Sequence, residues 1–157
     1  MSEQASSGGN LIVPAMSGFY QSVAAIADPM VRVATGLILA PHGAQKLFGW
    51  FGGGGISGTT KFFAKVGVEP AMPMVYLVGS VEFFGGLLVA IGLWTRPAAF
   101  AIAILMFGAI LTFNLNFGYF WTKGGIEFPL LWGIVALAIC IRGAGNFSVD
   151  AKIGREF

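Results

Sequence analysis

The chain has 157 residues, of which 56% are hydrophobic and only 10% are charged. Soluble domains carry about 25% charged residues, so this chain lacks the side chains that cover a water-facing surface. The small net charge of +2, without a basic cluster, argues against a nucleic-acid partner. A single cysteine, Cys140, excludes an internal disulfide, a CxxC pair and a cysteine-based metal site. The composition predicts an all-α integral membrane protein.

The first transmembrane helix is predicted at residues 29–48. Asp28 is a favoured N-cap, and Pro29 suits the first helical position. The sequence FGWFGGGG that begins at Phe48 ends this helix. The preceding residues 1–27 are expected to form a polar tail, which covers residues 1–10, and then a segment at the membrane interface.

Residues 56–71 form the longest predicted connection. Within it, Phe62 and Phe63 stand between Lys61 and Lys65, a pattern typical of a short helix at the membrane surface. Two turns of such a helix and a simple loop both remain open for this segment.

The rest of the chain contains three further apolar segments and ends in a polar tail at 144–157. Short connections between consecutive helices require antiparallel neighbours, so the predicted fold is a four-helix up-down-up-down bundle with both termini on one side. A domain at 28–143 would hold all four helices, predicted near 29–48, 72–94, 97–117 and 126–142.

Basic residues are divided between the two predicted ends of the bundle. The end with the termini has Arg32, Arg96, Arg142, Lys152 and Arg155, and the other end has Lys46, Lys61, Lys65 and Lys123. The slight excess at the first end favours cytoplasmic termini in a bacterial inner membrane. The three arginines of the helices are interpreted as interface anchors whose long side chains reach out of the bilayer.

Counting inward from these arginines indicates a polar layer within the membrane. Arg32 precedes Lys46 by 14 positions, Glu82 precedes Arg96 by 14, and Glu127 precedes Arg142 by 15. At about 1.5 Å per residue these steps are roughly 21 to 23 Å, so the three charged side chains are expected at one depth. His42 lies one helical turn from Lys46, and Asn114 could cover the site from the third helix.

Ionisable groups at this depth are costly unless they are paired, which makes them candidates for function. One lysine facing two carboxylates leaves an excess of negative charge and favours a shared proton, as a proton-transfer or ligand site needs. A purely structural interpretation has equal weight. Lys46 and Glu82 could form an ion pair that only sets helix register, and Glu127 could favour the positive end of its own helix. No metal site is predicted.

Three stretches of the chain resemble the DoxX family of small bacterial membrane proteins. They are RVATGLILAPHGAQKLFG from Arg32, EFFGGLLVAIGLWTR from Glu82, and GGIEFPLLWGIVALAICIRGAGNFSVD from Gly124. The resemblance covers about residues 28–150 and implies a four-helix membrane protein. It also implies an association with quinol or thiosulfate:quinone oxidation, or with membrane complexes that handle thiol and oxidative stress.

Two functions follow as hypotheses. The first is a membrane subunit of a redox system that meets a quinone or a partner oxidoreductase through the polar layer. No haem or iron–sulfur ligand set is visible in a chain with one Cys and one His, so electrons would come from a partner or a diffusible donor. The second is a non-enzymatic scaffold that docks membrane or peripheral proteins, with a homo-oligomer as one form. A transporter is disfavoured, because four helices leave little room for a pathway.

Overall fold

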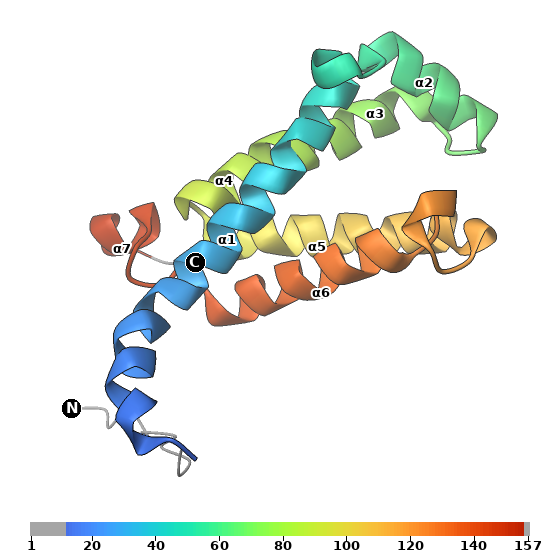
Figure 1. The fold of residues 1–157 in the computed structure, drawn as a ribbon. Coiled ribbons are helices and arrows are strands. Elements are labelled where there is room, and N and C mark those ends of the chain that lie inside the picture. Colours follow the sequence, from blue (N-terminus) through green and yellow to red (C-terminus); the bar gives the residue numbers. More distant parts are fainter. Residues whose placement is uncertain (1–11, 156–157) are drawn as a thin grey trace.

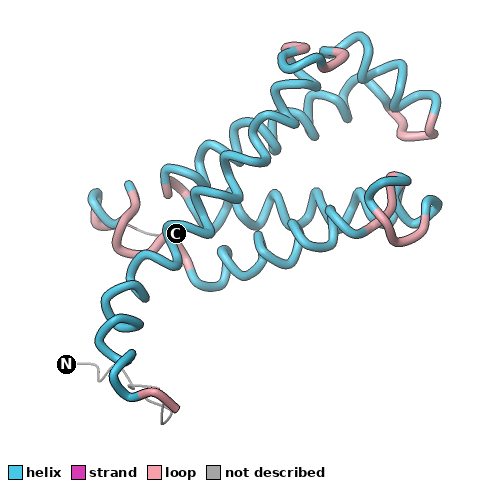
Figure 2. Tube along the Cα trace, in the orientation of Figure 1, coloured by secondary structure: helices cyan, strands magenta, loops and turns pink. Residues whose placement is uncertain are grey.

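The computed structural model describes residues 12–155, and within that range the regular structure is helical throughout (Figures 1 and 2). The prediction of a polar tail at residues 1–10 lies outside the described residues. The elements in chain order are η1 (Pro14–Met16), α1 (Ser17–Leu47), η2 (Trp50–Gly52), α2 (Gly55–Lys65), α3 (Ala71–Ser80), η3 (Val81–Gly85), α4 (Gly86–Ile91), α5 (Thr95–Thr112), η4 (Asn114–Phe117), η5 (Trp121–Lys123), α6 (Glu127–Arg142) and α7 (Val149–Ile153).

Three helices among the described residues are long and apolar enough to cross a membrane. They are α1, the continuous rod Ala71–Ile91 formed by α3, η3 and α4, and α5. The fourth long helix, α6, has 16 residues and lies along α5. The prediction of an all-α membrane protein is therefore confirmed.

The long helices form two hairpins. One pairs α1 with the α3–α4 rod, and the other pairs α5 with α6 (Figure 1). The hairpins meet around the α4–α5 connection and diverge towards α2. Close approach of α1 to α4 depends on Gly36, where a Cβ atom would lie 2.7 Å from the backbone nitrogen of Ala90. Small residues at such contacts let membrane helices pack through their backbones.

The prediction that the first helix begins at Asp28 is wrong, because α1 begins at Ser17 and contains Pro29. Membrane helices tolerate an internal proline when nearby groups satisfy the freed carbonyl. The Asp28 carboxylate does not cap the helix; its Oδ1 lies 2.6 Å from Nε of Arg142. The first turns of α1 point away from the other helices (Figure 1, blue).

The interpretation of Arg32 as a membrane-interface anchor is also wrong, because its side chain is 2% exposed. Nη1 donates to the carbonyls of Val89 (2.9 Å) and Ala90 (2.8 Å), and Nη2 donates to the carbonyl of Phe147 (2.6 Å). Arg32 thus donates to carbonyls in the last turn of α4, where carbonyls run short of helical partners; the carbonyl of Val89 also accepts from the N–H of Gly92 at 3.2 Å. It also fastens the C-terminal segment to the helices, so residues 144–155 are not a detached tail.

Asp150 completes this connection. Its Oδ1 accepts from the backbone N–H of Trp94 (2.9 Å), and its Oδ2 accepts from the backbone N–H (3.0 Å) and hydroxyl (2.9 Å) of Thr95. A residue distant in sequence therefore caps α5. Burial alone would raise the pKa of Asp150, but the hydrogen bonds from Thr95 and Trp94 and the charge of Arg32 hold it below its usual value.

Candidate functional site

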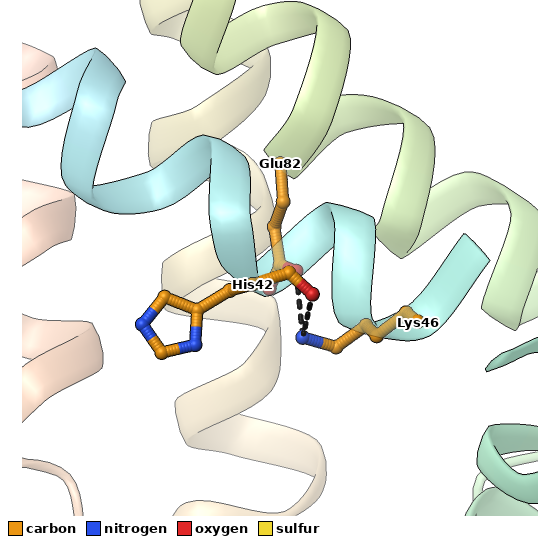
Figure 3. A network of polar contacts seen from close by, with 3 residues as sticks. All are labelled: His42, Lys46 and Glu82. Atoms are coloured by element: carbon orange, nitrogen blue, oxygen red, sulfur yellow. Dashed lines mark hydrogen bonds and ion pairs between the residues drawn. The ribbon is translucent and has the colours of Figure 1, made fainter. Parts of the chain in front are cut away.

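Lys46 and Glu82 form an ion pair between the two helices of the first hairpin. Lys46 lies in the last turn of α1, and Glu82 lies in η3 of the α3–α4 rod. The distance from Nζ to Oε2 is 2.6 Å, and the two side chains are 22% and 9% exposed, respectively (Figure 3). Nζ also donates to the backbone carbonyl of His42 at 3.4 Å. The predicted facing of these two charges is thus observed.

Glu82 belongs to a single π-helical turn, Val81–Gly85, within an otherwise α-helical rod. Such turns are rare and are found frequently at functional sites, because the wider turn changes the direction of the side chains it carries. Here the turn coincides with the buried carboxylate that meets Lys46.

Beside the ion pair lies a cavity of about 460 Å³, at the end of the molecule where the two hairpins diverge. This volume falls within the range of small-molecule sites, about 300 to 1,000 Å³. The lining is mainly apolar, with side chains from α1, α2, α3, α5 and α6. Its polar and charged side chains are His42, Lys46, Glu82, Thr112 and Asn114.

The polar side chains of the cavity differ in how fully their hydrogen-bonding capacity is used. Thr112 donates its hydroxyl to the carbonyl of Gly108 (2.9 Å), and Asn114 donates Nδ2 to the carbonyl of Gly124 (2.7 Å). The His42 side chain is exposed, and its ring points away from the ion pair (Figure 3). No residue in the range 12–155 hydrogen-bonds the ring nitrogens. The imidazole is therefore available to a ligand as a donor and an acceptor.

Glu127 does not join this cluster. It is the first residue of α6, it is absent from the cavity lining, and its Oε2 accepts from the backbone N–H of Trp121 at 3.0 Å. The count of helical rises concerned depth alone and carried no information on lateral position. Because the α5–α6 hairpin diverges from α1 at this end, equal depth does not bring Glu127 to Lys46. The carboxylate instead stabilises the turn that precedes its own helix.

One wall of the cavity comes from α2, which the sequence left open between helix and loop. Phe62 and Phe63 line the cavity, and the ring centroid of Phe62 is 5.8 Å from that of Phe113 on the opposite hairpin. Their spacing against Lys61 and Lys65 predicts an apolar face at the membrane surface. The structure shows that part of this face closes the site.

The arrangement suits a ligand with an apolar body and polar edges. The ammonium of Lys46 has three N–H donors and can bind a carbonyl oxygen, while Glu82 and the His42 imidazole can accept or return protons. Residues 12–155 include no group of three or more His, Cys, Asp or Glu side chains placed to hold a metal ion.

Comparison with known proteins gives a consistent result. The DoxX family model matches residues 27–115. "Putative oxidoreductase CatD" of Bacillus subtilis is 31% identical over 121 residues, which cover 77% of this chain and 82% of that protein. An "Uncharacterized protein" of Haemophilus influenzae is 30% identical over 112 residues, or 64% and 82% of the two chains. No solved structure shows a significant match.

Proposed function

Because the chain belongs to the DoxX family, we propose that it is a membrane subunit of a redox system whose cavity binds the headgroup of a quinone. The observation that carries the proposal is the Lys46–Glu82 ion pair in the wall of a mainly apolar cavity of about 460 Å³. The similarity to a protein named as an oxidoreductase supports the redox role.

Reduction of a quinone to a quinol consumes two electrons and two protons. In the proposed site Lys46 donates a hydrogen bond to one quinone oxygen, and Glu82 or His42 exchanges the protons. The electrons come from a partner oxidoreductase, because a chain with one Cys cannot itself supply the ligands of an iron–sulfur cluster.

We further propose that α6 also spans the membrane, which gives a four-helix up-down-up-down topology in the bacterial inner membrane with cytoplasmic termini. α6 is about 24 Å long at 1.5 Å per residue and lies along α5. Reporter fusions after residue 155 and within α2 are expected on opposite sides of the membrane. Fusions that report the same side for both positions would contradict the topology.

Binding of short-chain benzoquinone and naphthoquinone analogues to the purified full-length chain tests the proposed function. Trp132 lines the cavity, so quenching of its fluorescence is expected to saturate as the site fills, and removal of the other tryptophans isolates its signal. Lys46→Met is expected to weaken binding at least tenfold, because the cationic donor is lost. Lys61→Met is the matched control: Lys61 is exposed on α2, does not line the cavity, and should leave affinity unchanged.

Equal affinity in the two lysine variants would place binding elsewhere. The absence of saturable binding, together with a stable protein partner that copurifies, would favour the scaffold function instead.

A further inference from the structure

The cavity has an opening whose rim lies within two membrane-spanning helices, where the hairpins diverge (Figure 1). Leu77 on α3 and Ile104 on α5 both line the cavity and are 53% and 57% exposed, so they lie where the cavity meets the surface. Leu77 is the seventh residue of the span Ala71–Ile91, and Ile104 is the tenth of the 18 residues of α5. Both positions are more than one helical turn from the nearer end of their span, so this rim faces hydrocarbon rather than water.

Gly108 leaves open space beside this rim. It lies one helical turn from Ile104 and lines the cavity, and a Cβ atom added to it would meet nothing within 4 Å. Thr112, one turn further along α5, donates its hydroxyl to the carbonyl of Gly108 at 2.9 Å. This hydroxyl is thus satisfied within its own helix, which leaves an apolar opening. The opening formed by Leu77, Ile104 and Gly108 is called the lateral mouth here.

The end of the cavity towards α2 is covered by aromatic rings. Phe62 and Phe128 line the cavity and are also about half exposed, but the ring centroid of Phe62 is 5.8 Å from that of Phe113 on the opposite hairpin. Lys61 and Lys65 of α2 are exposed and do not line the cavity, as suits a helix at the membrane surface. A ligand that enters from water would have to displace these rings, whereas one that enters through the lateral mouth would not.

The cavity is larger than a single ring needs. A cavity of about 150 Å³ already accepts benzene, whereas this one has about 460 Å³. Lys46 and Glu82 suit a polar headgroup, and most of the remaining lining is apolar. The volume and the polarity thus allow an apolar chain that starts at the headgroup and leaves through the lateral mouth.

We propose that the lateral mouth holds the apolar tail of a ligand whose headgroup lies at the Lys46–Glu82 pair, and that this ligand enters the cavity from the bilayer. The inference rests on the proposed quinone site. It narrows the ligand to a tailed molecule dissolved in the membrane and excludes a small quinone that arrives from water.

Gly108→Leu tests the lateral mouth, because leucine fills the open space beside the rim. Gly58→Leu is the matched control: Gly58 lies in α2, an added Cβ atom there also meets nothing within 4 Å, and it does not line the cavity. Binding of a decyl-tailed benzoquinone and of the same ring without a tail is measured on the full-length chain by quenching of Trp132 fluorescence. Unfolding midpoints like that of the wild type show that both variants fold.

Gly108→Leu is expected to weaken binding of the tailed quinone at least tenfold, because leucine takes the place of part of the tail, and to change binding of the tailless ring less than twofold. Gly58→Leu should change neither affinity. Equal losses for the two ligands, or no loss for either, would overturn the lateral mouth. In both cases saturable binding of the tailless ring to the wild type would leave the headgroup site standing, whereas no binding of either ligand would overturn the proposed function as well.

A photoreactive group in the middle of the tail gives a second readout on the unaltered chain. Adducts are expected at residues 74–78 and 104–108, which surround the lateral mouth. Adducts confined to α2 would show that the tail leaves towards water and would overturn the proposal, even if the headgroup binds at Lys46.

Discussion

Lys46→Met is expected to lower the free energy of unfolding by about 3 kcal/mol, because it leaves a buried carboxylate without its cation. Glu82 is 7% exposed, and its Oε2 lies 2.6 Å from Nζ of Lys46. The expected value lies at the lower end for a broken buried pair, since Lys46 keeps 22% of its side-chain surface exposed. Loss of the ion pair should also loosen the packing of α1 against η3 around Gly43, which η3 contacts closely.

The double variant Lys46→Met/Glu82→Gln is expected to be more stable than Lys46→Met alone, because no uncompensated charge remains. Denaturant titration in mixed micelles, followed by tryptophan fluorescence, gives the four free energies of the cycle. Residues in one ion pair should show a coupling of at least about 1 kcal/mol. Lys61→Met is the control for loss of a lysine at an exposed site. Strictly additive effects of the two substitutions would show that the pair does not act as a unit.

Asp150→Asn is expected to destabilise the chain by about 2 to 4 kcal/mol. The carboxylate accepts three hydrogen bonds, from Trp94 and Thr95, and is 1% exposed. Hydrogen bonds to a charged group contribute about 1.5 to 3 kcal/mol each, and the asparagine keeps the shape but presents an N–H₂ group where one oxygen accepted. Loss of the cap should loosen the start of α5 and the attachment of the C-terminal segment.

The effect of Asp150→Asn should depend on pH in one direction. Because the folded pKa of Asp150 is lowered from the ordinary 3.8, its stabilisation is fully present above 3.8. It is lost as the pH falls through the lower pKa of the folded state. Unfolding midpoints of wild type and Asp150→Asn should therefore differ most near neutral pH and converge below 3.8. A difference between wild type and Asp150→Asn that stays constant across pH would rule out the Asp150 carboxylate as the cause.

Asp28→Asn is the comparison at an exposed carboxylate. Asp28 belongs to a half-exposed ion pair, so its replacement should lower the free energy of unfolding by less than about 1 kcal/mol.

Local signals predicted much of the fold. Glycine and proline at chain reversals placed the second, third and fourth long helices within a few residues of Ala71–Ile91, Thr95–Thr112 and Glu127–Arg142. The Lys46–Glu82 pair could be predicted because charged side chains in lipid are costly unless they pair, and these two lie on consecutive apolar helices. Asp28-Pro29 led to a wrong start for the first helix. A sequence that suits an N-cap can also lie inside a longer helix when its carboxylate pairs with another residue, here Arg142.

Contacts between distant segments could not be predicted. Arg32 and Phe147 are separated by 115 positions, and no periodicity relates them. The cavity depends on the angle at which the two hairpins diverge, which determines that α2 closes it and that Glu127 stays outside. Such angles follow from packing details, such as the close approach at Gly36, rather than from the pattern of one helix.

Photoaffinity labelling with a short-chain quinone analogue in native membranes tests the central claim, that the cavity is the ligand site, most directly. Labelled residues are expected on the cavity walls, at Phe62–Val66 in and just after α2 and at Leu105–Phe113 in and just after α5. Unlabelled quinone is expected to remove the label, and Lys46→Met is expected to reduce it while Lys61→Met does not. Label spread over the lipid-facing sides of α4 and α6, unaffected by competitor or by Lys46→Met, would contradict the account.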